Sequence, residues 1–312
     1  MKQMSYGRRL WYVWGPVIIK LVIGWLLSGI VVTAFLTIYM MKETGGDTAA
    51  MMELANDQSA MEEIQVEVIE QVLSVEVPIG MTAALLTLPV LAGFLFFDRK
   101  KGKPTALVRK KAHLWQYVAI IGIAVSMCLC LNNLITLANL SSLSESYEAV
   151  TEAFYSPPFW MQVLYLGILS PICEELTFRG LMFRRMRTYT PFLSAALYSS
   201  LVFAVIHGNL VQILYAFIMG MMFAYVYEKY GSLKAPCIAH IGANLFAVTA
   251  TQFGWMDKMF ENPMHMGILT VGCAACASTM YVLMQRMETG SFDPVAESRN
   301  DDSNNKMENL TV

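Results

Sequence analysis

Charged residues are scarce in this chain of 312 residues, at 15% of the sequence, whereas hydrophobic residues make up 56%. Soluble domains carry about 25% charged residues. The net charge of −2 provides no basic surface of the kind that binds nucleic acid. The composition therefore excludes an ordinary soluble domain and a nucleic-acid-binding protein. It predicts an all-α, polytopic integral membrane protein whose surroundings are the lipid bilayer.

Cysteines that could form an exposed disulfide framework are also missing. All six cysteines fall within apolar segments, where a small polarisable side chain packs well. Cys273 and Cys276 have the spacing of a redox or metal pair, but no second pair and no histidine lies near them in the sequence. We expect all six cysteines to serve packing.

Apolar segments long enough to be considered for membrane crossing recur along the chain. A bilayer crossing needs roughly 20 apolar residues, and on this basis we predict about eight transmembrane helices. They are residues 13–41, 79–97, 114–137, 159–183, 192–206, 211–227, 235–252 and 264–284. The fifth segment is short and the seventh contains Pro236 near its start, so both are candidates for broken or partly embedded helices.

Charge in the loops predicts the orientation. The stretch from residue 43 to residue 76 is rich in acids and holds no Lys or Arg, whereas residues 98–111 hold seven basic side chains. Positive loops stay in the cytoplasm. We therefore expect a multi-pass protein of the cell membrane with both termini cytoplasmic. Residues 48–75 have a loosely helical apolar spacing and are expected to form an amphipathic outer helix.

The chain is expected to have three regions. Residues 1–158 would form an N-terminal membrane region with three transmembrane helices and the acidic outer loop. Residues 159–287 would form a membrane core. Residues 288–312 are polar and are expected to be a disordered cytoplasmic tail.

Two adjacent glutamates inside the fourth apolar segment are the most informative feature. A charge at the bilayer centre costs roughly 2.5–3.5 kcal/mol on insertion scales, so Glu174 and Glu175 indicate a functional site. Glu175 and Arg179 are four residues apart in the favourable order for a helical ion pair. Glu174 points about 100° away from Glu175 on a helix and is left as the candidate general base. The alternative is a purely structural salt-bridge network.

Two of the four histidines join this group. His207 precedes the helix-ending pair Gly208 and Asn209, and His240 shares a helical face with Asn244, where the two could stabilise an oxyanion. Interhelical hydrogen bonding is the alternative for each. His113 and His265 are expected to be interfacial. Lys20 and Glu76 lie near the ends of their segments and are discounted as snorkelling or interfacial.

The motifs Glu174-Glu175-x-x-x-Arg179, Phe203-x-x-x-His207 and His240-x-x-x-Asn244, in this order, resemble the signature of the CPBP family. That family includes the CAAX prenyl endoproteases, bacteriocin-processing enzymes and Abi-like immunity proteins. The resemblance covers roughly residues 159–246. It implies an intramembrane peptidase in which Glu174 and His207 activate water, His240 and Asn244 stabilise the oxyanion, and Glu175 and Arg179 hold the geometry.

No cofactor is favoured. Zn²⁺ is the alternative, held by Glu174, His207 and His240, but the His-Glu-x-x-His pattern of common zinc peptidases is absent. Depth along straight helices is a difficulty. His240 lies about 9 Å from Lys234 and His207 about 24 Å from Pro191 at 1.5 Å per residue, so the site requires tilted or broken helices.

The sequence thus predicts an intramembrane endopeptidase that acts on a peptide or membrane-protein substrate near the cytoplasmic half of the bilayer. Two alternatives remain. One is a non-catalytic binding or immunity protein of the same family. The other is a proton-coupled transporter, for which midplane carboxylates and histidines are also expected.

Overall fold

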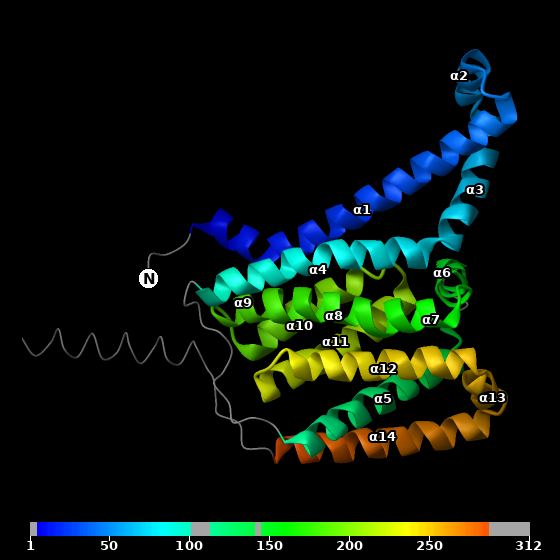
Figure 1. Cartoon of the computed structure of the whole chain (residues 1–312). Coiled ribbons are helices and arrows are strands. Elements are labelled where there is room, and N and C mark those ends of the chain that lie inside the picture. The colour runs from blue at the N-terminus through cyan, green and yellow to red at the C-terminus, as the bar shows by residue number, and fades with distance from the viewer. Residues whose placement is uncertain (1–4, 101–112, 141–144, 287–312) are drawn as a thin grey trace, which may run out of the picture.

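The computed structural model describes residues 5–100, 113–140 and 145–286. The expected cytoplasmic tail and most of the basic loop lie outside these residues. The described part is all-helical (Figure 1). Its elements are α1 (Tyr6–Thr44), α2 (Thr48–Asn56), α3 (Gln58–Ser74), α4 (Glu76–Lys100), α5 (Leu114–Leu137), α6 (Glu145–Tyr155), α7 (Phe159–Gln162), η2 (Val163–Leu169), α8 (Ser170–Glu175), η3 (Leu176–Phe183), α9 (Arg184–Arg187), α10 (Phe192–Val205), α11 (Leu210–Tyr230), α12 (Lys234–Gln252), α13 (Trp255–Phe260) and α14 (Pro263–Gln285).

Five of the described helices are long and apolar enough to cross a membrane: α1, α4, α5, α11 and α14. The polytopic, all-α prediction is confirmed in this form. Each of the eight predicted segments is helical, but three do not meet this criterion. The segment at 159–183 is divided among several helical elements, α10 has only 14 residues, and α12 carries His240 and Asn244 on its apolar run.

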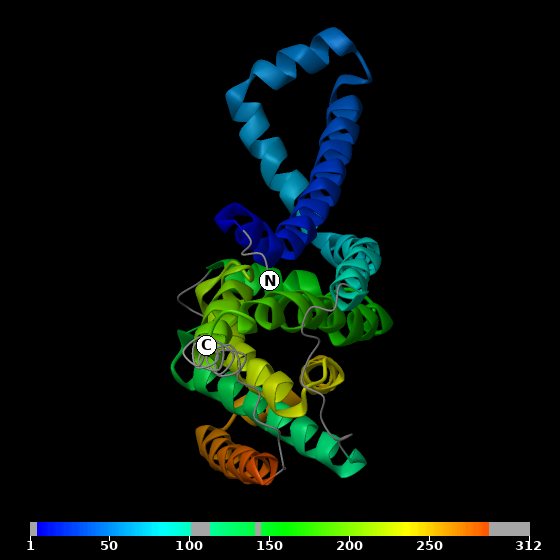
Figure 2. The ribbon, with the colours of Figure 1, turned by 90° about the vertical axis from the view of Figure 1, so that its left-hand side faces the viewer.

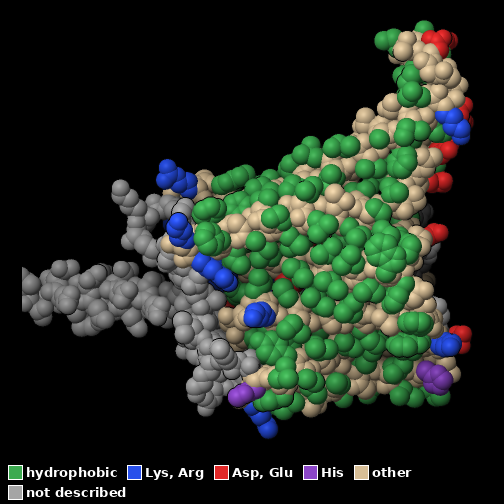
Figure 3. Space-filling view, viewed as in Figure 1, with side chains coloured by type: hydrophobic (Ala, Val, Ile, Leu, Met, Phe, Trp, Pro, Cys, Tyr) green, Lys and Arg blue, Asp and Glu red, His purple; other side chains and the backbone are tan. Residues whose placement is uncertain are grey.

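The helices form a bundle in which α5 packs against α12 and α14, and α10 packs against α11. Helices α1 and α4 lie together along one side, as the two perpendicular views show (Figures 1 and 2). The far end of α1 extends beyond the bundle with α2 and α3. Exposed Leu, Ile, Val, Phe and Trp side chains cover the sides of the bundle, as expected of a surface that faces lipid (Figure 3).

The expected amphipathic outer helix is two helices rather than one. Asp57 interrupts residues 48–75, because its carboxylate accepts hydrogen bonds from the backbone N–H groups of Ser59 and Ala60 at 3.0 and 3.2 Å and so caps α3. Helices α6 and α13 were not predicted. Pro236 does not break α12, since it lies in the first turn, where its missing N–H is not needed.

The six cysteines are all free thiols, and each is buried or partly buried. Cys273 and Cys276 form no disulfide and contribute to no metal-ligand group among the described residues. Their expected role in packing is consistent with this placement.

Candidate functional site

The two glutamates are the last residues of α8, between two π-helical segments. From Phe159 to Arg187 the chain is helical throughout, but its hydrogen bonding changes from α to π and back twice. π-Helical turns are rare and occur mostly at functional sites. Here they flank Glu174 and Glu175 on both sides, so the local backbone departs from a straight α-helix where the polar residues lie.

Glu175 holds two partners at the centre of the bundle. Its Oε1 accepts hydrogen bonds from Nη1 of Arg179 at 3.0 Å and from Nδ1 of His240 at 2.9 Å. Glu175 and Arg179 are both fully buried. The predicted i, i+4 ion pair is therefore present. A carboxylate that binds Nδ1 also fixes the orientation of a histidine ring and leaves Nε2 for other contacts.

Arg179 makes further contacts besides its ion pair with Glu175. Its Nη2 donates to the carbonyl oxygen of Gly220 on α11 at 2.8 Å. The guanidinium lies against the rings of Phe203 and Phe223, at 4.6 and 5.4 Å from their centroids. A Cβ at position 220 would lie 3.1 Å from that same Nη2, so glycine permits the close approach. The arginine thereby ties η3 to α10 and α11.

Glu174 points away from this pair and is held by three different groups. The hydroxyl of Ser170, one turn earlier, donates to its Oε1 at 2.7 Å. The ammonium of Lys20 on α1 lies 4.0 Å from the same oxygen, and Nε2 of His240 lies 3.8 Å from Oε2. Glu174 thus has a cation and an imidazole beside it while its side chain remains 14% exposed.

His207 follows the end of α10, where Gly208 turns the chain with a φ of 83°. Its Nδ1 is 2.8 Å from the carbonyl oxygen of Phe203. Because a carbonyl can only accept, Nδ1 must carry the hydrogen, and in the neutral ring Nε2 is left as a proton acceptor. The Phe203 ring packs edge-on against both His207 and His240, at centroid distances of 4.9 and 6.1 Å.

Asn244 lies one turn after His240 on α12. One hydrogen of its amide nitrogen goes to the carbonyl oxygen of Leu166, within the first π segment, at 2.9 Å. The amide nitrogen has a second hydrogen. The hydrogen bond to Leu166 therefore fixes the position of Asn244, and its second N–H group can donate to another acceptor.

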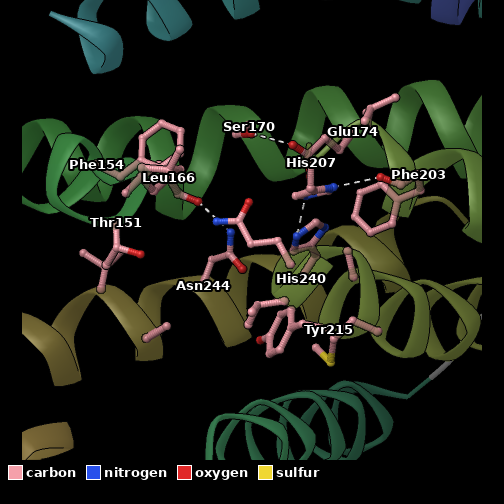
Figure 4. A pocket seen from close by; sticks show the side chains of 18 of the residues that line it. Thr151, Phe154, Leu166, Ser170, Glu174, Phe203, His207, Tyr215, His240 and Asn244 are labelled. Atoms are coloured by element: carbon pink, nitrogen blue, oxygen red, sulfur yellow. Dashed lines mark hydrogen bonds and ion pairs between the residues drawn. The ribbon is translucent and has the colours of Figure 1, made fainter. Parts of the chain in front are cut away.

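A cavity of about 530 Å³ joins these groups (Figure 4). Glu174, His207, His240 and Asn244 all line it, together with Lys20 and Ser170. Straight helices would place the site residues at different depths in the membrane, and the length of this cavity explains in part how they can still share it. The lining on α11 runs from Val211 to Phe223, thirteen residues whose ends are about 18 Å apart along the helix. Residues at different depths can therefore face one cavity.

Two residues that the sequence reasoning set aside belong to this cavity. Lys20 and Glu76, which were discounted from the site as snorkelling or interfacial, both line it. Ser170 was missed, although its position four residues before Glu174 is a signal that could have been used. For Lys20 the only signal was a charge inside an apolar run. Its partner is 154 positions away and could not be found from spacing.

The two adjacent glutamates have different cationic neighbours. Glu174 lies beside Lys20, and Glu175 is paired with Arg179. The described residues contain no group of three His, Cys, Asp or Glu side chains placed to hold a metal ion. Glu174, His207 and His240, the alternative zinc set, do not form such a group.

Comparison with known proteins finds similarity in the same region. Residues 156–246 match the family "Type II CAAX prenyl endopeptidase Rce1-like". The chain is 31% identical over 105 residues to the "Putative membrane peptidase YdiL" of Bacillus subtilis (strain 168), covering 34% of this chain and 42% of the relative. It is 30% identical over 105 residues to the "UPF0177 protein YxdF" of Lactococcus lactis subsp. lactis (strain IL1403), covering 33% of this chain and 56% of the relative.

The match thus spans about half the length of these curated relatives. No solved structure matches. Residues 156–246 are thus similar to the Rce1-like family, the same family that the three motifs resemble. Lys20, on α1, and Glu76, on α4, lie outside the matched residues.

Proposed function

We propose that this chain is an intramembrane endopeptidase that hydrolyses peptide bonds of membrane-associated peptides or proteins. The observation that carries the proposal is the shared cavity. It is lined by the carboxylate of Glu174, which accepts a hydrogen bond from Ser170. It is also lined by His207 and His240, whose Nδ1 atoms are both hydrogen-bonded, and by the amide of Asn244, which donates to a backbone carbonyl. The family match at residues 156–246 and the name of the Bacillus relative support the same reaction.

In the proposed reaction Glu174 is the general base. A water molecule in the cavity gives a proton to its carboxylate while the water oxygen attacks the scissile carbonyl carbon, and Nε2 of His207 orients that water. The carbon–nitrogen bond then breaks, and Glu174 passes the proton to the leaving amine. General acid–base catalysis by a positioned group contributes typically 10²–10⁴-fold.

The oxyanion needs donors in a place that excludes bulk water. The second amide hydrogen of Asn244 is one. His240 is the other in its protonated form, because Nδ1–H is engaged by Glu175 and Nε2–H remains for the substrate oxygen. Arg179 fixes Glu175, which fixes His240. Glu175 and Arg179 are thus positioning residues rather than catalytic ones.

The proposed architecture has eight membrane crossings, three more than the length and composition criterion finds. The additional ones are the helical stretch 159–187 and the helices α10 and α12. Residues 1–158 form the N-terminal membrane region, 159–287 the catalytic core and 288–312 a tail, with both termini cytoplasmic. The basic side chains of α4, α9 and α12 at one end of the bundle support this orientation (Figure 3).

The test is cleavage of a fluorogenic peptide pool by the purified full chain in liposomes. Glu174→Gln and His207→Ala are expected to lower the rate by about 10²–10⁴-fold, and Asn244→Ala by about 10²–10³-fold. The matched controls are Glu53→Gln and His265→Ala, whose side chains are exposed and outside the cavity. Unreduced cleavage by Glu174→Gln would refute the general-base assignment.

Metal dependence is tested in the same assay. A reaction driven by Glu174 alone is expected to survive prolonged treatment with a chelator. Loss of cleavage on chelation, restored by Zn²⁺ but not by Mg²⁺, would contradict the metal-free mechanism.

A further inference from the structure

The cavity is not symmetric along the bundle. Glu174 and Phe203 lie toward one end of it (Figure 4). Several other lining residues belong to the opposite end of the helices: Glu76 in the first turn of α4, Asn132 and Ile135 near the end of α5, five residues of α6, and Gln212 in the first turn of α11. In Figure 4, Thr151 and Phe154 of α6 lie at the end of the cavity away from Glu174.

That end of the bundle is the acidic one. The described acidic residues of α2 and α3 lie there, whereas most described Lys and Arg side chains gather at the other end (Figure 3). The exceptions are Lys20 and Arg179 at the site and Lys42 and Lys258 at the acidic end. Helices α9 and α12 place their basic residues at the same basic end. By the positive-inside rule the basic end is cytoplasmic and the acidic end is not.

The basic end is closed by packed and paired side chains. Asp98 on α4 accepts hydrogen bonds from Arg184 and Arg185, each at 2.8 Å, and Arg187 pairs with Glu228 on α11 at 2.7 Å. The three arginines are each less than 9% exposed. These ion pairs join α9 to α4 and α11.

A buried apolar cluster lies on the same side of the site. It contains Phe183, Ala195, Ala196, Ala224 and Tyr227. None of these side chains, and none of the paired arginines, lines the cavity. Between the described helices, then, the end of the cavity near Glu174 is bounded toward the basic side by close packing.

We infer that the cavity is loaded from the acidic, non-cytoplasmic end of the bundle, past α6. This inference rests on the proposed function and assigns the substrate class, which is a polypeptide segment presented on the non-cytoplasmic side of the membrane. The expectation of cleavage near the cytoplasmic half of the bilayer is replaced by this inference. A chain end in the cytoplasm would meet the ion pairs of Asp98 and Arg187 instead of an opening.

The lining suits an extended peptide. Near the entrance Glu76 is the one carboxylate among the described lining residues, and the other hydrogen-bonding side chains are uncharged, namely Asn132, Tyr147, Thr151 and Gln212. Such groups can bind the backbone N–H and C=O groups of a peptide without requiring a charged side chain in it. The apolar side chains Val150, Phe154 and Val248 lie among them. We therefore expect a segment with small or apolar residues around the cleaved bond.

Access is tested by thiol labelling of the full chain in intact cells with a small, charged, membrane-impermeant reagent. Thr151→Cys reports the entrance, Ser170→Cys the interior beside Glu174, and Lys234→Cys the basic end, where Lys234 is exposed. The chain with only its native cysteines gives the baseline. Both cavity variants are expected to label in intact cells as fully as after lysis, and Lys234→Cys only after lysis. The opposite pattern would overturn the inference.

A second measurement uses cleavage itself. Sealed right-side-out membrane vesicles are expected to cleave an added water-soluble peptide pool, and sealed inside-out vesicles only after detergent is added. Cleavage by sealed inside-out vesicles alone would overturn the inference. Absence of cleavage in both, even in detergent, would instead refute the proposed function, and the labelling result would still decide the side of access because it needs no catalysis.

Discussion

Removal of Arg179 provides the sharpest test of how the site is held together. Arg179→Met keeps the length of the aliphatic stem but removes the charge, the 3.0 Å hydrogen bond to Glu175 and the 2.8 Å bond to Gly220. Glu175 is fully buried, and among the described residues its Oε2 already has no hydrogen-bond partner. The variant would leave a buried carboxylate with His240 alone.

Breaking a buried ion pair by removing one partner costs about 3–5 kcal/mol. Because the unfolding entropy is about 2.1 cal/mol/K per residue, each kcal/mol shifts the Tm of a chain of 312 residues by about 1.5 °C, and we expect the Tm in detergent to fall by about 5–8 °C. The assay is thermal unfolding followed by intrinsic fluorescence. Arg286→Met, which removes an exposed arginine, is the matched control and should leave the Tm unchanged.

The double variant Arg179→Met/Glu175→Gln separates charge from packing. It removes the uncompensated carboxylate but keeps an oxygen that can accept from His240, so it should recover most of the lost stability. If Arg179→Met unfolds at the wild-type temperature, leaving Glu175 buried without its arginine does not destabilise the fold, and the expected cost of about 3–5 kcal/mol is wrong. If the double variant is no more stable than the single one, the loss arises from packing against Phe203 and Phe223.

Three further substitutions are informative. Ser170→Ala removes the hydrogen bond to Glu174. Because bonds to charged groups contribute about 1.5–3 kcal/mol to stability, the Tm should fall by about 2–5 °C, and kcat should fall because the base is no longer held in position; an unchanged kcat would show that this bond does not orient the base. Lys20→Met should lower kcat and Lys20→Arg should restore part of it, whereas equal activity of both variants would exclude a role for the charge. Gly220→Ala places a Cβ 3.1 Å from Nη2 of Arg179 and should lower both the Tm, measured by unfolding, and kcat, measured by peptide cleavage. Wild-type values would show that the arginine can move without loss of stability or activity.

Much of the fold follows from local signals in the sequence. Apolar runs of sufficient length predicted the helices at 114–137 and 264–284 within a residue of their ends, because hydrophobicity and the Pro and Asn signals at helix starts act locally. The π segments around Glu174 were not predictable. Apolar periodicity does not distinguish a π turn from an α turn, and the tertiary contacts of this stretch are not encoded in any spacing.

The site was predictable where its partners share a helix. Glu175 with Arg179 and His240 with Asn244 are four apart, and that spacing is enough to place each pair on one face. The contacts that join the pairs, such as His240 with Glu175, link residues 65 positions apart and depend on how α12 packs against α8. The same limit hid Lys20 and the direction in which the cavity extends.

The adjacency of two carboxylates in an apolar bundle is explained by their division between two cations from different places. Glu175 is neutralised from its own helical stretch by Arg179, inside the residues that match the family. Glu174 is approached by Lys20, which belongs to α1 and lies outside them. A buried charge is tolerated only when it is paired or hydrogen-bonded. The N-terminal helix therefore does more than anchor the chain, since it brings to the cavity the one lysine that lines it among the described residues and so places a cation beside Glu174.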